Sequence, residues 1–254
     1  MKLTRRETLI LAAAATAAGV AGFPTLSFAK EDDVIDPLKL MAPAGIPDKV
    51  LGNPDAKVTV IEYASPTCPH CALFSNTVLQ AFKDKYVTTG KVKFILRPFA
   101  RNTMDAAIFM LAEAAADSSN GAAAAATPAD ASSSSAAAPA PAPADPKNPS
   151  GLSQSAIGTY ENVIGTYFKT QDTWGVSDKP LDAVKAVAVQ LGFSDDSFNT
   201  ALKNQDFFTK IGTMRDQAVN DFGLEGTPTF YINGKQLTGE KTLDQLSAEI
   251  DPLL

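Results

Sequence analysis

Alternating and periodic apolar positions predict a strand, a helix and a strand in the first half of the chain. Residues 57–64 (KVTVIEYA) alternate and are rich in β-branched side chains, which predicts a strand. Residues 91–99 (KVKFILRPF) predict a second strand. Between them, apolar residues recur every four positions, as one face of an amphipathic helix requires: Phe74, Val78, Phe82 and Tyr86. Elements of these lengths form a βαβ unit, so the expected fold class is α/β.

Helical spacing dominates the middle of the chain. Four apolar stripes each predict the buried face of one helix: Met104, Ile108 and Leu111; Val163, Ile164, Tyr167 and Phe168; Leu181, Val184, Val187, Ala188 and Leu191; and Phe207, Ile211, Met214, Ala218 and Phe222. Gly192 follows the third stripe and Gly223 the fourth, where a glycine commonly ends a helix. We assign all four stripes to the core and none to a cofactor site.

The end of the chain returns to β structure. Residues 229–232 (TFYI) predict a strand, and Asn233 with Gly234 predicts a type I′ turn that brings residues 235–237 back beside it. Apolar residues at helical spacing then predict a last helix: Leu243, Leu246 and Ile250. The predicted order is therefore β-α-β, a helical insert, and β-β-α.

Two segments lack such patterns. Residues 117–151 contain no Val, Ile, Leu, Met or aromatic residue. They cannot bury enough apolar surface to offset the entropy lost on ordering, and six prolines limit any helix, so we predict a disordered loop. Residues 30–54 are proline-rich and weakly patterned, which predicts an ordered or semi-ordered lead-in before the first strand.

The N-terminus has the pattern of an export signal. A basic start precedes an apolar run over residues 9–21, and small residues at Ser27 and Ala29 resemble a cleavage site, so we expect cleavage after Ala29. Residues 4–9 also resemble a twin-arginine signal, but Thr8 stands where a large apolar residue is common, so an ordinary secretory signal stays open. Export would place the mature chain in an oxidising compartment, the periplasm, where disulfide chemistry is permitted.

Composition narrows the classes of partner. The 254 residues are 45% hydrophobic, which suffices for one good-sized domain or two small ones. A formal charge of −6 argues against nucleic acid and against an anionic membrane surface, because both require a basic face. The lead-in before Val58, which could carry an oligomerising segment, lacks heptads, so a monomer is expected.

The two cysteines of the chain, Cys68 and Cys71, lie where the first strand runs into the first helix. Unpaired N–H groups and the positive end of the helix dipole favour a thiolate at Cys68. Pro69 suits the first helical position, where its missing N–H costs nothing. His70, the single histidine, would stabilise the thiolate further when protonated. A stabilised thiolate makes the disulfide a stronger oxidant.

Two other uses of this Cys-x-x-Cys pair stay open at this point. A zinc site requires four N or S ligands, and only His70 remains, poorly placed beside Cys71. A structural disulfide that closes so short a loop adds little stability. We interpret Cys68 and Cys71 as a redox centre that works through its own disulfide, without a bound cofactor or metal. A metal-binding module is the alternative from a different class.

Cys-Pro-His-Cys combined with a later Gly-Thr-Pro-Thr-Phe, here residues 226–230, resembles the DsbA-like thiol–disulfide oxidoreductases of the thioredoxin superfamily, which are exported bacterial proteins. The resemblance implies a thioredoxin fold, that is a central mixed β-sheet with flanking helices, interrupted by an inserted all-helical subdomain. The boundaries expected are 1–29 for the export signal, 30–54 for the lead-in, 55–102 and 221–254 for the thioredoxin-fold domain, and 103–220 for the insertion with its disordered loop at 117–151.

The resemblance also implies roles for three further residues. Pro228 is expected to be cis and to face the cysteine pair, so that the backbone of Thr227 binds a substrate strand; without the resemblance, Thr-Pro predicts an ordinary trans turn. Glu62 matches a buried acid that accepts or relays the proton of the second cysteine, and an exposed strand carboxylate is the alternative.

The implied function is that of a periplasmic enzyme which introduces disulfides into exported proteins. Its partners would be unfolded or partly folded exported chains and a quinone-linked membrane protein that reoxidises it. A disulfide isomerase or reductase of the same fold is the alternative, because the sequence separates the two directions of exchange poorly.

Overall fold

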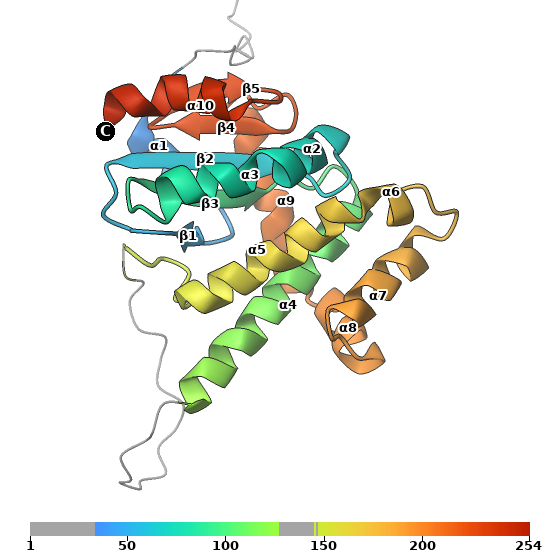
Figure 1. Cartoon of the computed structure of the whole chain (residues 1–254). Helices are drawn as coiled ribbons and strands as arrows, with labels where there is room; N and C mark the ends of the chain where they lie inside the picture. The colour runs from blue at the N-terminus through green and yellow to red at the C-terminus, as the bar shows by residue number, and fades with distance from the viewer. Residues whose placement is uncertain (1–33, 127–144, 146) are drawn as a thin grey trace, which may run out of the picture.

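A five-stranded mixed sheet lies at the centre of the computed structural model, which describes residues 34–126, 145 and 147–254 (Figure 1). The spatial order is β1-β3-β2-β4-β5, where β2 and β3 are parallel and the other pairs antiparallel. The strands are β1 Val50–Leu51, β2 Val58–Ala64, β3 Val92–Pro98, β4 Thr229–Ile232 and β5 Lys235–Thr238. The expected α/β class with a central mixed sheet is confirmed.

Helices cover both faces of this sheet, and a group of helices lies beyond it. Figure 1 shows α2, α3 and α10 in front of the strands, α9 behind them, and α4 to α8 below. The helices are α1 Pro37–Leu40, α2 Pro69–Thr77, α3 Leu79–Phe82, α4 Thr103–Ala126, α5 Gln154–Lys169, α6 Gln171–Trp174, α7 Pro180–Gln190, α8 Asp195–Leu202, α9 Gln205–Asn220 and α10 Leu243–Ile250, with the π-helical turn η1 Lys83–Val87 and the 3-10 turn η2 Asp251–Leu253. All but one residue of β2 and of β3 is buried as a result.

The amphipathic helix predicted after the first strand is present in three pieces. α2 ends at Thr77, α3 follows after the cap residue Val78, and the π-helical turn η1 completes the segment before Gly90 turns the chain with φ 71°. The predicted apolar face is nevertheless the buried one, since Phe74, Phe82 and Tyr86 are at most 2% exposed. Period-four spacing therefore identified the buried face but not the breaks in the helix.

The prediction of a disordered loop over 117–151 is wrong for residues 117–126, which are the last ten residues of α4. Asn120 accepts a hydrogen bond from the N–H of Ser153 at 2.9 Å, and Thr159 donates to Ser119 at 3.2 Å, so this part of α4 packs on α5. Alanine has the highest helix propensity, and the first proline comes only at Pro128, so the helix continues from its apolar half. The prediction for residues 127–144 and 146 lies outside the described residues.

The sheet also begins earlier than the expected boundary at residue 55. β1 belongs to the lead-in and pairs antiparallel with β3, Val50 opposite Ile95. The lead-in is fastened by Arg97 of β3, whose guanidinium donates two hydrogen bonds of 2.7 Å to Asp48 and one of 2.6 Å to the Leu40 carbonyl. A third group, the Tyr63 hydroxyl, accepts from Arg97 at 2.9 Å. A buried ion pair thus joins the lead-in to the central strands.

The predicted hairpin near the C-terminus is confirmed. Asn233 and Gly234 have φ of 48° and 96°, and a type I′ turn requires positive φ at both central positions. Gly223, with φ 63°, lies just beyond the end of α9, where the sequence predicted a helix end. The turn also holds β2, because the Asn233 side chain accepts a hydrogen bond from the N–H of Thr59 at 2.8 Å.

The expected export signal, residues 1–29, lies outside the described residues. Within the part of the chain that the structure describes, no helix has the length and apolar character that crossing a lipid bilayer demands.

Arg97→Leu should lower the free energy of unfolding by about 3–5 kcal/mol, because it leaves the Asp48 carboxylate buried without its cation. Urea unfolding of the oxidised protein measures the change. The matched control is Lys147→Leu, which breaks the solvent-exposed Lys147–Asp55 pair (side chains 61% and 62% exposed) and should leave the midpoint unchanged. Equal shifts in the two variants would show that burial of the Arg97 pair contributes nothing.

Candidate active site

Cys68 is the N-cap residue of α2, with extended backbone (φ −85°, ψ 120°), and Pro69 occupies the first helical turn. The N–H of Cys68 donates to the Ser65 carbonyl at 2.9 Å, and the Cys68 carbonyl accepts the first helical hydrogen bond from Ala72 at 3.1 Å. The first N–H groups of α2 consequently have no helical partner and lie beside the Cys68 sulfur. The structure thus places Cys68 and Pro69 as the sequence predicted.

The carboxylate of Asp105, which the sequence analysis did not identify, fixes the turn before Cys68. It is fully buried and accepts hydrogen bonds from the Ser65 hydroxyl at 2.8 Å, the Thr67 N–H at 2.7 Å and the Arg101 N–H at 2.8 Å. Its position in the first turn of α4 follows from Asn102, whose side chain caps the helix by accepting from the Asp105 N–H at 3.0 Å. The Asn-Thr-Met-Asp run was therefore an available signal for this helix start.

Two more side chains hold the same turn from outside the central sheet. Arg101 donates to the Ser65 hydroxyl at 3.0 Å and to the Thr67 hydroxyl at 3.0 Å. Gln171 of α6 donates to the carbonyls of Pro66 at 2.7 Å and of Cys68 at 3.1 Å. No local sequence pattern marks Gln171, which is 103 positions from Cys68.

The two cysteines are buried free thiols with opposite acidity. A hydrogen bond from Cys71 is the largest cause that lowers the pKa of Cys68 to about 5. The nearby Thr227 side chain and hydrogen bonds from the N–H groups of Cys71 and His70 act in the same direction, against burial. Burial, together with the hydrogen bond to Cys68 and the negative charge of Glu62, raises the pKa of Cys71 well above its ordinary value. At neutral pH the pair is therefore a Cys68 thiolate beside a Cys71 thiol.

The Thr227–Pro228 peptide bond is cis, as the family resemblance implied. When protonated, the Cys68 thiol donates to the Thr227 carbonyl at 3.1 Å, so the loop before β4 faces the cysteine pair. The Thr227 hydroxyl is buried and has no hydrogen-bond partner among the described residues, which leaves it able to donate to a thiolate at Cys68.

His70 pairs with a residue that the sequence analysis did not identify. Its Nδ1 forms a short ion pair with Glu240, in the connection from β5 to α10, and both side chains are exposed. This hydrogen bond and the Glu240 charge raise the pKa of His70, and the charge of Cys68 acts in the same direction more weakly. The main effect of His70 on Cys68 is the hydrogen bond from its backbone N–H.

Glu62 is a buried acid, and the alternative of an exposed strand carboxylate is wrong. It lies in β2 and is 1% exposed, and its Oε1 has no hydrogen-bond partner among the described residues. Burial is the largest cause that raises the pKa of Glu62 to about 8, and the charge of Glu161 adds to it. The carboxyl group is consequently neutral at pH 7 and titrates in the range where thiols exchange protons.

No group of three or more His, Cys, Asp or Glu side chains within residues 34–126, 145 and 147–254 is arranged to hold a metal ion.

Known proteins are similar to this chain in both sequence and fold. A family model described as Thioredoxin matches residues 46–140 and 150–252. Relatives from Rickettsia felis and Rickettsia bellii, whose names contain the words protein-disulfide oxidoreductase, are 25% identical over 220 residues and 28% identical over 215 residues. These alignments cover 87% and 80% of this chain, but the chain spans 65% and 63% of the two relatives' own length.

Solved structures agree with these sequence matches. A crystal structure of alpha-DsbA1 from Wolbachia pipientis superposes with a TM-score of 0.65 and 26% identity, and it covers 86% of this chain and 96% of its own. BdbD from Bacillus subtilis, at 18% identity and a TM-score of 0.52, shares the fold over 84% of this chain and 97% of its own. The chain belongs to the thioredoxin family, with a DsbA-like thioredoxin fold that carries a helical insertion.

Proposed function

We propose that this protein is a periplasmic thiol–disulfide oxidoreductase that introduces disulfides into exported proteins. The observation that carries the proposal is the Cys68 thiolate, with a pKa of about 5, next to a buried Cys71 thiol. A stabilised thiolate favours the reduced form of the pair, so the disulfide form is a strong oxidant of other thiols. The reaction needs no bound cofactor, because the Cys68–Cys71 disulfide itself accepts the two electrons.

In the first step a substrate thiolate attacks the Cys68 sulfur of the oxidised protein. The Cys68–Cys71 bond breaks, a mixed disulfide between the substrate and Cys68 forms, and the Cys71 sulfur takes up a proton. A second thiolate of the substrate then attacks the substrate sulfur that is bonded to Cys68. The bond to Cys68 breaks, and Cys68 leaves as a thiolate. The low pKa makes Cys68 a good leaving group, which speeds this second step.

The surface around Cys68 suits an unfolded chain. The loop of Thr227 and Pro228 presents backbone groups beside the sulfur, which can pair with an extended substrate segment. A groove of about 310 Å³ between α2 and α10 offers the apolar side chains of Leu73 and Val78 next to Glu240, and Leu73 is 49% exposed. Partly folded exported chains present both a cysteine and such apolar segments.

The rest of the cycle follows from the same chemistry. After each turnover the protein is reduced, and it requires an oxidant; we assign this step to a quinone-linked membrane protein that accepts the electrons.

The signal pattern of residues 1–29 supports export to the periplasm, and the absence of heptads supports a monomer.

The reduction potential of the Cys68–Cys71 pair, measured by equilibration with glutathione, should be nearer to about −120 mV than to about −270 mV. Because folding lowers the pKa of Cys68, the thiolate stabilises the folded reduced protein at high pH, and this stabilisation is lost as the pH falls through about 5. The reduced form should accordingly lose its stability advantage over the oxidised form progressively as the pH falls from about 9 to about 5. A reducing potential would assign the protein to disulfide reduction or isomerisation instead.

Cys68→Ala should abolish exchange with a peptide dithiol, because the attacked sulfur is gone. Cys71→Ala should retain a reactive Cys68 and accumulate mixed disulfides, visible as adducts by mass spectrometry of protein recovered from an oxidising compartment. Exchange that continues in Cys68→Ala at the rate of the unaltered protein would refute the assignment of Cys68.

Thr227→Val should move the titration of Cys68 to higher pH, because it removes a hydroxyl that donates to the thiolate and keeps the side-chain shape. The ultraviolet absorbance of the thiolate follows this titration, and the reduction potential should become less oxidising in parallel. Thr229→Val is the matched control, since the Thr229 hydroxyl donates to the Gly226 carbonyl at 2.7 Å and not to sulfur. An unmoved titration in Thr227→Val would rule out the Thr227 hydroxyl as a donor to Cys68.

A further inference from the structure

Glu62 lies on the sheet face that α2, η1 and α5 cover. In the parallel register of β2 and β3, Val60 is opposite Phe94 and Glu62 is opposite Leu96. Side chains two positions apart share a face, so these four point to the same side of the sheet. The amine of Lys83, from η1, lies 5.9 Å from the centre of the Phe94 ring, which places η1 over this face.

The same face leads from Glu62 to Cys71. In the antiparallel register of β2 and β4, Glu62 is opposite Phe230, and the ring of Phe230 packs edge-on against Phe74 at 4.8 Å between centres. Phe74 is three positions after Cys71 in α2, so Phe74 and Cys71 lie on one face of that helix. The negative charge of Glu62 accordingly contributes to the raised pKa of Cys71.

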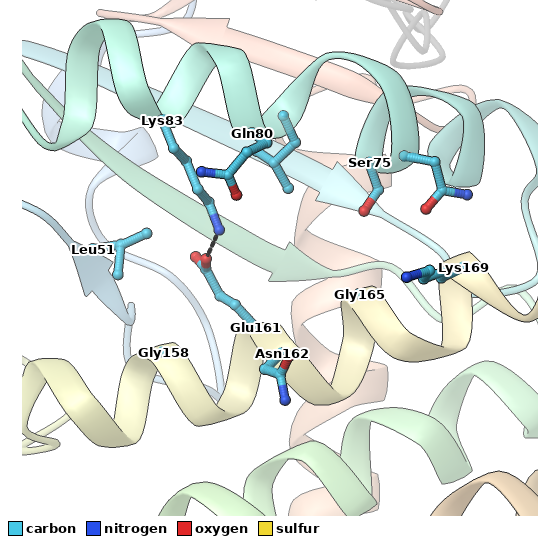
Figure 2. Close-up of a pocket in the computed structure, with 11 residues that line it drawn as sticks. Leu51, Ser75, Gln80, Lys83, Gly158, Glu161, Asn162, Gly165 and Lys169 are labelled. Atoms are coloured by element: carbon cyan, nitrogen blue, oxygen red, sulfur yellow. Dashed lines mark hydrogen bonds and ion pairs between the residues drawn. The ribbon is translucent and has the colours of Figure 1, made fainter. Parts of the chain in front are cut away.

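An ion pair between Lys83 and Glu161 bridges the space between η1 and α5 (Figure 2). The side chains are 20% and 7% exposed, and Glu161 Oε1 has no hydrogen-bond partner among the described residues. The charged and titratable groups that act on Glu62 are Glu161 and Lys83 together with the thiols of Cys68 and Cys71. Glu161 raises the pKa of Glu62, and Lys83 lowers it by less.

The ion pair forms part of the wall of a pocket of about 490 Å³ that opens between α2, α3 and α5. Figure 2 shows Lys83 and Glu161 meeting there, with Ser75, Gln80 and Lys169 also along the walls.

Two glycines of α5, Gly158 and Gly165, line the pocket three positions before and four positions after Glu161. A Cβ added to either would meet nothing within 4 Å, so close packing does not require glycine there. Glycine is unfavourable within a helix, and at these two positions it leaves the pocket wall beside Glu161 without side chains.

We propose that the Lys83–Glu161 ion pair is a positioning pair for the disulfide exchange: it sets the charge of Glu62 and connects Glu62 with the water in this pocket. The inference rests on the proposed function, because it describes how the proton of Cys71 leaves and returns during each cycle. Lys83 and Glu161 touch neither cysteine and act through Glu62.

The proton transfer from Cys71 occurs in the half of the cycle that reoxidises the protein. With Cys68 in a mixed disulfide with glutathione, Cys71 gives its proton to the Glu62 carboxylate and attacks the Cys68 sulfur. The bond between Cys68 and glutathione breaks, the Cys68–Cys71 disulfide forms, and glutathione leaves as a thiolate. Glu62 then releases the proton to pocket water past the ion pair. The rate of this step rises with pH as Glu62 ionises, around pH 8.

The test measures how fast the Cys68–glutathione mixed disulfide resolves as a function of pH in the full mature protein. Glu161→Gln removes the charge that opposes ionisation of Glu62 and leaves Lys83 to favour it, so the midpoint of the pH profile should fall by about one pH unit. In the double variant with Lys83→Met, both charges are gone. Since Glu161 acts more strongly than Lys83, the double variant should have a midpoint between those of Glu161→Gln and the unaltered protein.

Lys169→Met is the matched control, because Lys169 lines the same pocket on the same helix but is not part of the ion pair. Its midpoint should equal that of the unaltered protein. The infrared band of the Glu62 carboxyl group, assigned by its loss in Glu62→Gln, gives an independent titration that should follow the same order. This readout does not require turnover and reports on variants whose activity is low.

A disturbance of packing alone would make the double variant depart most from the unaltered protein, and that order would overturn the proposal. An unmoved midpoint in Glu161→Gln would overturn it as well. Failure of the proposed function gives a different result, since the Cys68–glutathione adduct would then not form or would resolve equally fast in Cys71→Ala.

Discussion

The position of Cys68 at the start of α2 depends on the buried carboxylate of Asp105, which comes from a different part of the chain. Asp105 accepts from the Ser65 hydroxyl and the Thr67 N–H in the connection from β2 to α2, and from the Arg101 N–H in the connection from β3 to α4. A buried carboxylate needs such hydrogen bonds to offset its desolvation, so the two connections stabilise one another. The sulfur is consequently held where the N–H groups of α2 can stabilise a thiolate.

Two other acidic groups of the same site, Cys71 and Glu62, are protonated at neutral pH, whereas Cys68 is ionised. Hydrogen bonds lower the pKa of Cys68, whereas burial raises the pKa values of Cys71 and Glu62. A negative charge on Cys68 also disfavours ionisation of the other two, so the three groups share one charge at neutral pH. In the proposed exchange each group therefore has a separate role: Cys68 is attacked and leaves, Cys71 resolves the mixed disulfide, and Glu62 exchanges the proton.

The sequence predicted those parts of the fold that local patterns determine. Strong periodicity found β2, β3 and the buried faces of α4, α5, α7, α9 and α10, and Asn233 with Gly234 found the hairpin. Periodicity missed α8, and it wrongly placed Leu181 of α7, which is 44% exposed, in the core. β1, with two residues, and α6, with four, are too short to show a period, and α4 runs on because alanine favours a helix without any apolar stripe. In the site, the Cys-Pro-His-Cys motif identified the residues proposed to react, Cys68 and Cys71. Partners at a distance, such as Gln171 at 103 positions from Cys68, depend on tertiary packing that no local spacing reveals.

The helical insertion therefore does more than cover the sheet. It supplies Asp105, which fixes the turn before Cys68, Gln171, which holds the Cys68 carbonyl, and Glu161, which pairs with Lys83. Without the charge of Glu161, Lys83 would let Glu62 ionise at a lower pH. Glu161 neutralises that cation and adds its own repulsion, which keeps the pKa of Glu62 near that of a thiol. Because a general base works best when its pKa lies near the operating pH, Glu161 helps to adapt a buried strand carboxyl to the proton exchange proposed beside Cys71.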